Sequence, residues 1–211
     1  NYYLGGLLQF NSSLPLIKEN ENFQNIINPK ISIKMSPDHT KNQSSNFTRL
    51  DVNNVYGMNR LASNDSLEGG LSLTYGSEFK RINKVNSREN LVFKIANNTR
   101  LDENKNLPTN NQMGQKTSNF FGEISFDPNE FFTTKYNFST KNNFNDISYE
   151  NFTTNLNLDK FETSFDYINE NDKKDKISYY KSELKYNFND TSNISFSTRE
   201  NIEKDLTEYY N

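Results

Sequence analysis

Hydrophobic and polar residues alternate along much of the second half of the chain. Between residues 132 and 139, aromatic or threonine side chains occupy every second position, and polar side chains stand between them. A period of two is typical of a β-strand whose two faces meet different surroundings. The alternation recurs at 152–158, 161–167, 180–188 and 194–198. We therefore predict five consecutive strands in this half.

The first half carries the same pattern less regularly. Shorter alternating segments lie at 31–33, 71–75, 91–95 and 120–126. A strand before these requires that the pattern continue through Leu14 and Leu16. No segment has a sustained helical period of about 3.6 residues with capping residues at its ends. The chain is thus predicted to be all-β, with about ten strands.

The predicted connections alternate in length. Long or polar loops are expected at 37–66, 97–116, 141–146 and 170–176, and short turns at 127–130, 159–160 and 189–191. Successive connections of an up-and-down antiparallel sheet lie on opposite rims, and outer-membrane barrels keep short turns on one rim and long loops on the other. Strands of about ten residues also suffice to cross a hydrocarbon layer at a tilt. We therefore predict antiparallel up-and-down strands that are part of a large transmembrane β-barrel.

Two other architectures have the same alternation. A secreted, soluble β-sandwich acting as a binding module fits it, although its strands are usually nearer 5–6 residues. Another outer-membrane β-barrel, such as a porin or lipid transporter, has the same two faces and a different cargo. Membrane fractionation of the full-length protein separates the sandwich from the two barrels.

Composition agrees with a wall that has one polar face. Only 32% of the 211 residues are hydrophobic, although 14% are aromatic. No window approaches 18 uninterrupted apolar residues, so no transmembrane helix is predicted, and no signal-peptide pattern is present. The formal net charge of -3 argues against a nucleic-acid partner. The chain has no Cys, which excludes disulfides and thiolate metal sites, and it begins and stops within the pattern like a segment of a longer protein.

No catalytic constellation is visible, so we expect no enzymatic activity and no cofactor. His39 is the only histidine, and its place in a polar loop favours a solvated residue over a general base. Short acidic clusters at 64–66 and 102–104 lack the full ligand series of a Ca²⁺ site and are interpreted as turns.

Two further features have alternative interpretations. The charged run at 170–176 is interpreted as a solvated loop tip. Its alternative is contact with the phosphates of lipid A, which the lysines of the run could make: Lys173, Lys174 and Lys176. The Gly69-Gly70 pair opens a predicted strand and is interpreted as a bend, with close passage of a polar ligand as the alternative.

Four segments together are more specific than the alternation. They are a Pro-led strand at 28–37, a loop core at 50–60, a Gly-Gly strand that ends at Tyr75-Gly76, and a strand at 116–124. Their order and composition resemble the barrel of the lipopolysaccharide-assembly outer-membrane proteins, the LptD or organic-solvent-tolerance family. The resemblance covers about 28–127.

Within this resemblance, some residues match family positions and others depart from them. The matching residues are Arg60, Asp65, Gly69 and Gly70. We interpret them as structural residues that order an outer loop against the barrel. Ser63 and Ser66 stand where the family usually has Gly and Arg, so Asp65 lacks the family's second arginine as a partner for an ion pair.

The resemblance implies a location and partners. Family members lie in the outer membrane of Gram-negative bacteria, where a periplasmic β-jellyroll domain precedes a very large barrel plugged by a lipoprotein. Lipopolysaccharide arrives over periplasmic bridge proteins and leaves by a lateral opening between the first and last strands. Residues 1–211 are then expected to be a single partial barrel segment of the lipopolysaccharide translocon, without the jellyroll and the terminal strands. The implied partners are lipopolysaccharide, the plug lipoprotein, outer-membrane lipids and, through the absent domain, the bridge proteins.

Overall fold

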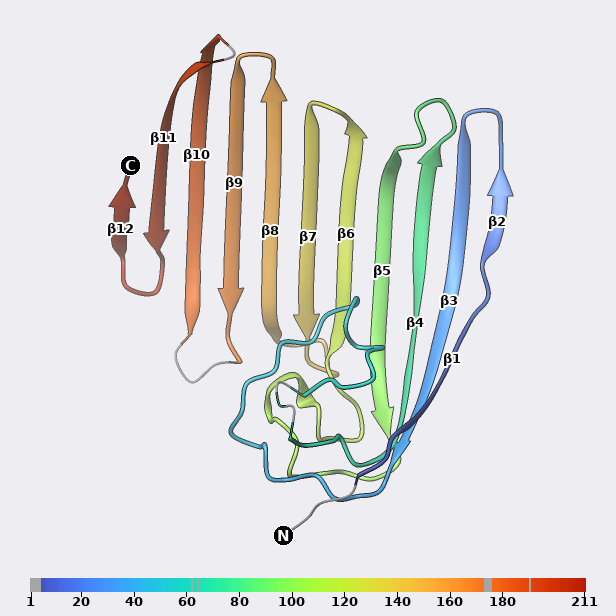
Figure 1. The fold of residues 1–211 in the computed structure, drawn as a ribbon. Coiled ribbons are helices and arrows are strands. Elements are labelled where there is room, and N and C mark those ends of the chain that lie inside the picture. The colour runs from blue at the N-terminus through green and yellow to red at the C-terminus, as the bar shows by residue number, and fades with distance from the viewer. Residues whose placement is uncertain (1–4, 62, 64, 173–175, 190) are drawn as a thin grey trace.

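The computed structural model describes residues 5–61, 63, 65–172, 176–189 and 191–211. They form one curved antiparallel sheet of twelve strands and a short 3-10 turn, η1, at Asn110–Gln112 (Figure 1). The strands are β1 (Leu8–Ser13), β2 (Leu16–Glu19), β3 (Phe23–Ser36), β4 (Gly70–Asn83), β5 (Glu89–Arg100), β6 (Phe120–Asn129), β7 (Phe132–Thr140), β8 (Ile147–Leu158), β9 (Phe161–Glu170), β10 (Ile177–Asn189), β11 (Ser192–Asn201) and β12 (Leu206–Tyr210). From β3 onward each strand pairs with its neighbours in the chain, so the predicted all-β, up-and-down architecture is confirmed.

The strand count differs from the expected ten at both edges of the sheet. β1 and β2 both pair with β3 and form one strand interrupted at Pro15, which has no backbone N–H to add to the ladder. The N–H of Leu14 still donates to the carbonyl of Pro29 at 3.1 Å. At the other edge, β12 follows a turn in which Asp205 has a φ of 48°. Within the described residues, β1, β2 and β12 each pair with one strand, so the sheet is open.

The long and short connections lie on opposite rims, as predicted. The described parts of 37–69, with 101–119, 141–146, 171–172 and Lys176, lie at the lower end of the sheet in Figure 1, and we call this end the long-loop rim. The turns that join β4 to β5, β6 to β7 and β8 to β9 lie at the upper, short-turn rim. The turn between β10 and β11 contains Asp190, which lies outside the described residues.

Three predicted boundaries are wrong, because β6 continues through Asn129 into the turn predicted at 127–130 and β9 continues through Glu170 into the loop predicted at 170–176. The third lies at the end of β5. The sequence pattern predicts a loop over 97–116, but β5 continues through Arg100. The end of β5 is polar on both faces and therefore lacks the alternation of a strand with one apolar face. Its polar side chains are buried and hydrogen-bonded: the Nδ2 of Asn98, for example, donates to the Oγ1 of Thr74 at 2.9 Å. Because this buried end of the strand has no alternation of polar and apolar residues, the sequence pattern predicts a loop there.

The strand register separates two faces. The inner face is mostly polar and includes Lys30, Ser32, Lys34, Ser72, Thr74, Glu78, Lys94, Asn98, Glu123, Lys135, Asn137, Asn155, Asn157, Asp166 and Lys181. The outer face is mostly apolar and includes Ile31, Ile33, Leu73, Phe93, Ile124, Phe126, Phe132, Phe152, Leu156, Phe161, Phe165, Leu184 and Phe196. Many of these apolar side chains are exposed; Phe196, for instance, is 52% exposed. The assignment of Leu156 to one face and Asn155 to the other agrees with the prediction.

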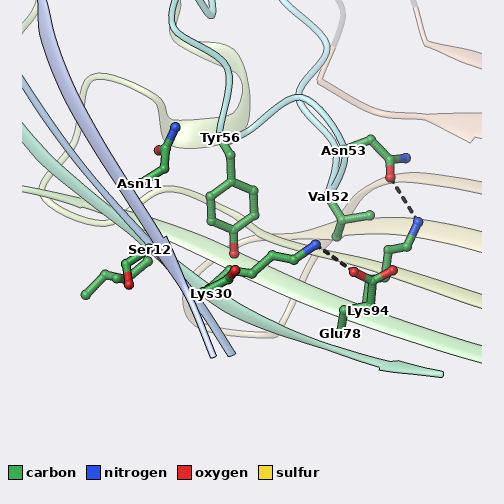
Figure 2. Close-up of a pocket in the computed structure, with 10 residues that line it drawn as sticks. Asn11, Ser12, Lys30, Val52, Asn53, Tyr56, Glu78 and Lys94 are labelled. Carbon is green, nitrogen blue, oxygen red and sulfur yellow. Dashed lines mark hydrogen bonds and ion pairs between the residues drawn. The ribbon is translucent and has the colours of Figure 1, made fainter. Parts of the chain in front are cut away.

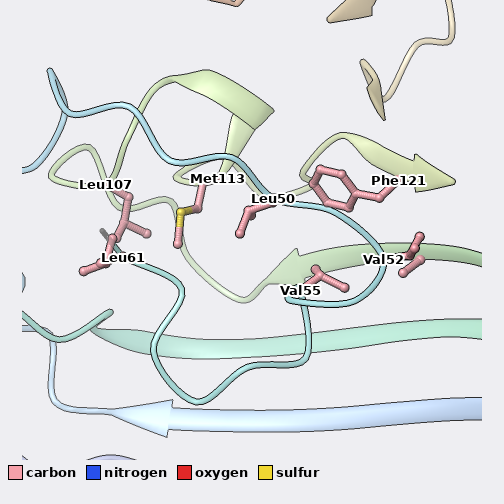
Figure 3. Packing of buried hydrophobic residues seen from close by; sticks show 8 residues of the cluster. Leu50, Val52, Val55, Leu61, Leu107, Met113 and Phe121 are labelled. Carbon is pink, nitrogen blue, oxygen red and sulfur yellow. The ribbon is translucent and has the colours of Figure 1, made fainter. Parts of the chain in front are cut away.

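The buried hydrophobic cluster lies on the inner face, beneath the two longest loops. We call these loops, 37–69 and 101–119, the loop cover. The cover contributes Leu50, Val52, Val55, Leu61, Leu107 and Met113, and the sheet contributes Ala96 and Phe121 (Figure 3). Ala96 and Phe121 are register partners on β5 and β6, and they are apolar exceptions on a polar face. The sheet therefore offers the cover a small apolar platform.

The two faces can be compared with a matched pair of arginine substitutions in the full-length protein. Leu156→Arg places a charge on the apolar face, where it costs roughly 2–4 kcal/mol at the middle of a bilayer and ~0–1 near its surface. Asn155→Arg places the same side chain on the polar face and is expected to cost little. We expect Leu156→Arg to lower the yield of heat-modifiable, assembled barrel more than Asn155→Arg. The reverse order would mean that the register of β8 is shifted by one residue.

Candidate functional site

The two loops of the cover hold each other through backbone and amide hydrogen bonds. The N–H of Gln43 donates to the carbonyl of Asn106 at 2.7 Å. The N–H of Thr48 donates to the Oδ1 of Asn110 at 3.2 Å, and the Nδ2 of Asn110 donates back to the carbonyl of Thr48. The loop cover is therefore one folded unit on the inner face.

A buried charge cluster ties this unit to the sheet. The carboxylate of Glu68 accepts from the Nε of Arg60 at 2.8 Å and from the Nη1 of Arg100 at 2.6 Å, and it also pairs with the Nη2 of Arg60. The ammonium of Lys34 lies 3.5 Å from the same carboxylate. Each of these four side chains is at most 4% exposed. Glu68 and Arg60 come from the cover, and Lys34 and Arg100 come from β3 and β5.

Arg60 also reaches the strands directly. Its Nη1 donates to the carbonyl of Val55 at 3.3 Å and to the Oγ1 of Thr74 at 3.2 Å, and its Nη2 donates to the Oγ of Ser72 at 3.3 Å. A guanidinium has five N–H donors in a rigid fork, so one side chain can bind a carboxylate and several strand hydroxyls at once.

The cluster holds Glu68 in its charged form. Burial alone would raise the pKa of this carboxyl, but the charge and hydrogen bonds of Arg60, with the charges of Lys34 and Arg100, outweigh burial and lower the pKa to about 2. Removing one partner of a buried pair costs about 3–5 kcal/mol, because the other charge stays buried without compensation. Glu68 thus joins Arg60 of the cover to Lys34 and Arg100 of the strands.

The glycine pair that opens β4 lies beside this cluster. Gly70 has a φ of +89°, and a Cβ there would lie 2.8 Å from the Nη2 of Arg100. A Cβ on Gly69 would lie 2.8 Å from the carbonyl oxygen of Pro37. The pair forms a bend that lets the start and the end of the first loop pass closely.

In a second contact, Tyr56 of the cover packs over Gly76 of β4, where the missing side chain leaves a hole in the inner face. Tyr56 points from the cover toward the inner face, and a Cβ on Gly76 would lie only 2.5 Å from its hydroxyl oxygen. The backbone carbonyl of Tyr56 accepts from the Nε2 of Gln9 on β1 at 2.6 Å. Burial raises the pKa of this tyrosine to about 12, helped by the nearby carboxylate of Glu78, so the hydroxyl stays a hydrogen-bond donor. The Tyr75-Gly76 ending of the family-like segment therefore provides the hole.

A cavity of about 410 Å³ lies beside Tyr56, between the cover and the strands (Figure 2). Its lining includes Lys30, Glu78 and Lys94 from the strands and Asn53 and Tyr56 from the cover. The ammonium of Lys30 pairs with Glu78 at 2.6 Å, and that of Lys94 donates to the Oδ1 of Asn53 at 3.0 Å. Hydroxyl and apolar side chains add to the lining: Ser12, Ser13, Ile31 and Val52.

The carboxylates of this region are each shared between two lysines. Glu78 lies between Lys30 and Lys80, the latter at 3.4 Å. Glu123 lies between Lys94 and Lys135, each at 2.9 Å. The group of Lys94, Lys135 and Glu123 therefore carries a net positive charge, whereas Lys80 also pairs with Glu89 at 2.8 Å, so the group around Glu78 is neutral. Such a surface can exchange its internal ion pairs for contacts with anionic or sugar-like groups.

The cover reaches across the sheet to strands far from its base. The Nη2 of Arg49 donates to both carboxylate oxygens of Glu170, at 2.8 and 2.9 Å, and the guanidinium lies 4.6 Å from the ring centre of Tyr149. Glu170 ends β9 and Tyr149 lies in β8. Near this contact, the N–H of Asn111 donates to the Oδ2 of Asp172 at 3.3 Å. The first loop thus begins at β3, touches β9 and returns to β4.

The residues singled out in the sequence divide into two groups. Arg60, Gly69 and Gly70 come together in and beside the buried cluster. Asp65 lies apart from it on the surface, where hydrogen bonds from Ser63 and Lys41 lower its pKa; the ammonium of Lys41 is 2.9 Å away. Lys41 of the same loop therefore takes the place of the missing arginine as the ion-pair partner of Asp65.

The other candidates lie in exposed loops or outside the described residues. His39 is exposed, as is Lys176 just before β10. Lys173 and Lys174 lie outside the described residues. Within the part of the chain that the structure describes, no three His, Cys, Asp or Glu side chains gather in a way that could hold a metal ion. Contact of the three lysines with lipid-A phosphates stays a prediction.

The sequence analysis also missed a carboxylate on the apolar outer face. Glu150 pairs in register with Phe138 and lies two residues before the alternating segment recognised in β8 at 152–158. Its carboxylate accepts from the hydroxyl of Tyr136 at 3.0 Å and from the Nδ2 of Asn169 at 3.2 Å, and the hydroxyl of Tyr167 lies 3.5 Å away. Tyrosines whose rings lie on an apolar face and whose hydroxyls bind polar groups are typical of the interfacial girdles of membrane barrels.

The comparisons with known proteins identify the family. The sequence profile of the LPS transport system D family, LptD, matches residues 7–206. The match spans almost the whole chain, so the chain belongs to this family, which serves lipopolysaccharide transport at the outer membrane. The resemblance seen at 28–127 is thereby confirmed and extended to the later strands. No curated protein sequence matches the chain.

Among the described residues, no helix is both long enough and apolar enough to cross a membrane.

The role of the buried cluster can be tested with two isosteric substitutions in the same loop. Glu68→Gln leaves two arginines buried without a carboxylate and is expected to release the cover, with a loss of about 3–5 kcal/mol. Asp65→Asn removes an exposed surface pair, which contributes little to stability. In the full-length protein in detergent, trypsin should cleave after Lys41 and Arg49 much faster in Glu68→Gln, and nearly as in the parent in Asp65→Asn. Equal cleavage in all three proteins would show that the cluster does not hold the cover.

The cluster also predicts how the cover responds to acid. Because the pKa of Glu68 is lower in the folded state than in an unfolded chain, its stabilising effect is present above about pH 4.5 and is lost as the pH falls toward 2. Pepsin should therefore cleave the cover near Leu50 increasingly as the pH falls from about 4 to 2. The same protein with Glu68→Gln should be cleaved readily throughout this range. A parent protein that resists pepsin equally at both ends of the range would contradict the assignment.

Proposed function

We propose that this chain forms part of the barrel wall of the translocon that inserts lipopolysaccharide into the outer leaflet of a Gram-negative outer membrane. Its apolar outer face lies against the membrane lipids, and its polar inner face lines the lumen. The long-loop rim faces the outside of the cell and the short-turn rim faces the periplasm, as in other outer-membrane barrels.

The division of the sheet into two chemically different faces supports this proposal most directly. The strands with the longest ladders, β3 and β4, pair in register over fourteen residues each, and most of their outer side chains are apolar, with Ile31, Ile33 and Leu71 among the exposed ones. The opposite face carries hydroxyls, amides and paired charges. A soluble sandwich would bury its apolar face against a second sheet, and the described residues form a single sheet.

The open edges of the sheet support a wall that further strands complete. Unpaired backbone groups at β1, β2 and β12 are costly in a hydrocarbon layer, so in the membrane they need strand partners. We place a plug lipoprotein against the uncovered part of the inner face, and we assign delivery of lipopolysaccharide to periplasmic bridge proteins that dock outside this segment. The contribution of this segment is passive: it binds and guides, and the driving force comes from elsewhere.

Depletion of the full-length protein in its native bacterium tests this function. We expect newly made lipopolysaccharide to disappear from the cell surface and to accumulate in the inner membrane, as followed by pulse labelling and a membrane-impermeant surface probe. Depletion of an abundant porin in the same strain is the control. Normal surface lipopolysaccharide combined with slower uptake of small solutes would instead identify the protein as a porin.

A further inference from the structure

One group of charges on the inner face is unbalanced. The ammonium groups of Lys94 and Lys135 each lie 2.9 Å from the carboxylate of Glu123, so two positive charges share one negative charge. The side chain of Glu123 is 4% exposed, whereas those of Lys94 and Lys135 are 23% and 46% exposed. The wall therefore holds a buried carboxylate beneath two ammonium groups that solvent reaches.

The neighbouring pairs do not supply the missing anion. Glu78 faces Lys94 in register, but its oxygens pair with Lys30 at 2.6 Å and with Lys80 at 3.4 Å. Lys80 pairs with Glu89 as well. The four lysines and three carboxylates of these linked pairs leave one positive charge in excess.

Lys135 can bind a second anion without leaving Glu123 unpaired. An ammonium group has three N–H donors, so it can contact two oxyanions at once, and Lys94 neutralises the buried carboxylate in either case. Exchanging one contact of an exposed ion pair costs little. Because Lys135 is nearly half exposed, an anion reaches it from the lumen while the cover stays docked.

The cover adds neutral hydrogen-bonding groups at the same place. The Oδ1 of Asn53 accepts from Lys94 at 3.0 Å, and its Nδ2 lies 3.4 Å from the carboxylate of Glu123. Tyr56 points its hydroxyl into the adjoining cavity, toward Lys30 (Figure 2). Sugar hydroxyls both donate and accept, and this wall offers them an amide, a phenol and ammonium groups. The volume of about 410 Å³ lies within the range of small-molecule sites, so the cavity takes a short saccharide.

We propose that Lys94, Lys135, Asn53 and Tyr56 form a binding site for an acidic saccharide, that is, a sugar that carries a phosphate or a carboxylate. The oxyanion binds at the two ammonium groups, and the sugar hydroxyls bind the amide and the phenol. This inference rests on the proposed function, since it takes the saccharide part of lipopolysaccharide to pass along this wall, and it names the place and the chemistry by which the wall recognises it.

Three soluble saccharides test the recognition of charge. The full-length protein in detergent is titrated by calorimetry with the lipid-free core oligosaccharide of its own bacterium, with the same oligosaccharide after removal of phosphate, and with a neutral glucose oligomer of equal length. We expect the first to bind and the neutral oligomer to bind at least about tenfold more weakly, because it lacks the charge-assisted contact. Binding that is lost with the phosphate identifies phosphate as the oxyanion, and binding that survives identifies a sugar carboxylate. Equal affinity for the neutral oligomer would overturn the site.

A matched pair of lysine substitutions tests the location. Lys135→Gln is expected to weaken binding of the core oligosaccharide about tenfold, and Lys135→Arg, which keeps the charge, to restore much of it. Lys80→Gln is the control, because Lys80 lies on the same face at a similar exposure to Lys94 but has Glu78 and Glu89 as partners. Heat-modifiable gel mobility shows that each variant is assembled. An equal loss of affinity in Lys80→Gln and Lys135→Gln would mean that attraction is spread over the wall, and would contradict a site.

Tyr56→Phe tests the part of the cover. This change keeps the ring over Gly76 and removes only the hydroxyl, so we expect weaker binding with the cover still docked, as judged by an unchanged rate of trypsin cleavage. Parental affinity in this variant would remove Tyr56 from the site.

The outcomes separate the site from the proposed function. If depletion stops export while the purified protein binds the neutral oligomer as tightly as the acidic one, the site is wrong and the function stands. If depletion leaves surface lipopolysaccharide unchanged, the function is wrong, and the titrations decide on the site. In that case, affinity for the acidic saccharide that falls in Lys135→Gln supports a site in a barrel with another cargo, and affinity equal to the parent overturns it.

Discussion

Every backbone amide and carbonyl group of this wall has to find its partner within the sheet, because a hydrocarbon layer offers none. The long antiparallel ladders follow from this requirement, and so does the period of two in the sequence, since each strand then shows one face to lipid and the other to the lumen. The break at Pro15 is tolerated at an edge of the described sheet, where the missing N–H removes one rung from a single ladder. The fold is thus fixed by backbone pairing, and the side chains decide what each face can touch.

The inner face cannot be held together by apolar packing alone, because most of its residues are polar. The cover therefore docks at three unlike places: on the apolar pair Ala96 and Phe121, in the hole at Gly76, and on the charges around Glu68. Replacing a buried ion pair by apolar residues is often neutral or even stabilising, so the charges of the cluster are not required for stability as such. They do make the docking specific. A carboxylate fits between two guanidinium groups in one position only, and apolar contacts would not define that position.

Much of the wall could be predicted from the sequence, because its signal is local. The alternation located the strands, and the lengths of the connections assigned them to rims. The boundary at 97–100 was wrong because the end of β5 is buried on a polar surface and so reads as polar in the sequence. Of the cluster, Arg60 was found through the family resemblance. Glu68 stood in the same segment and was not singled out, although a buried guanidinium needs an acidic partner.

The remaining contacts could not be predicted because they join residues that are distant in the sequence. Arg49 and Glu170 are separated by 121 positions, and nothing local marks either as a partner of the other. Phe121 does carry a signal, since it is an aromatic residue in the polar phase of its strand. Such an exception on an inner face indicates where something other than water or cargo rests on the wall.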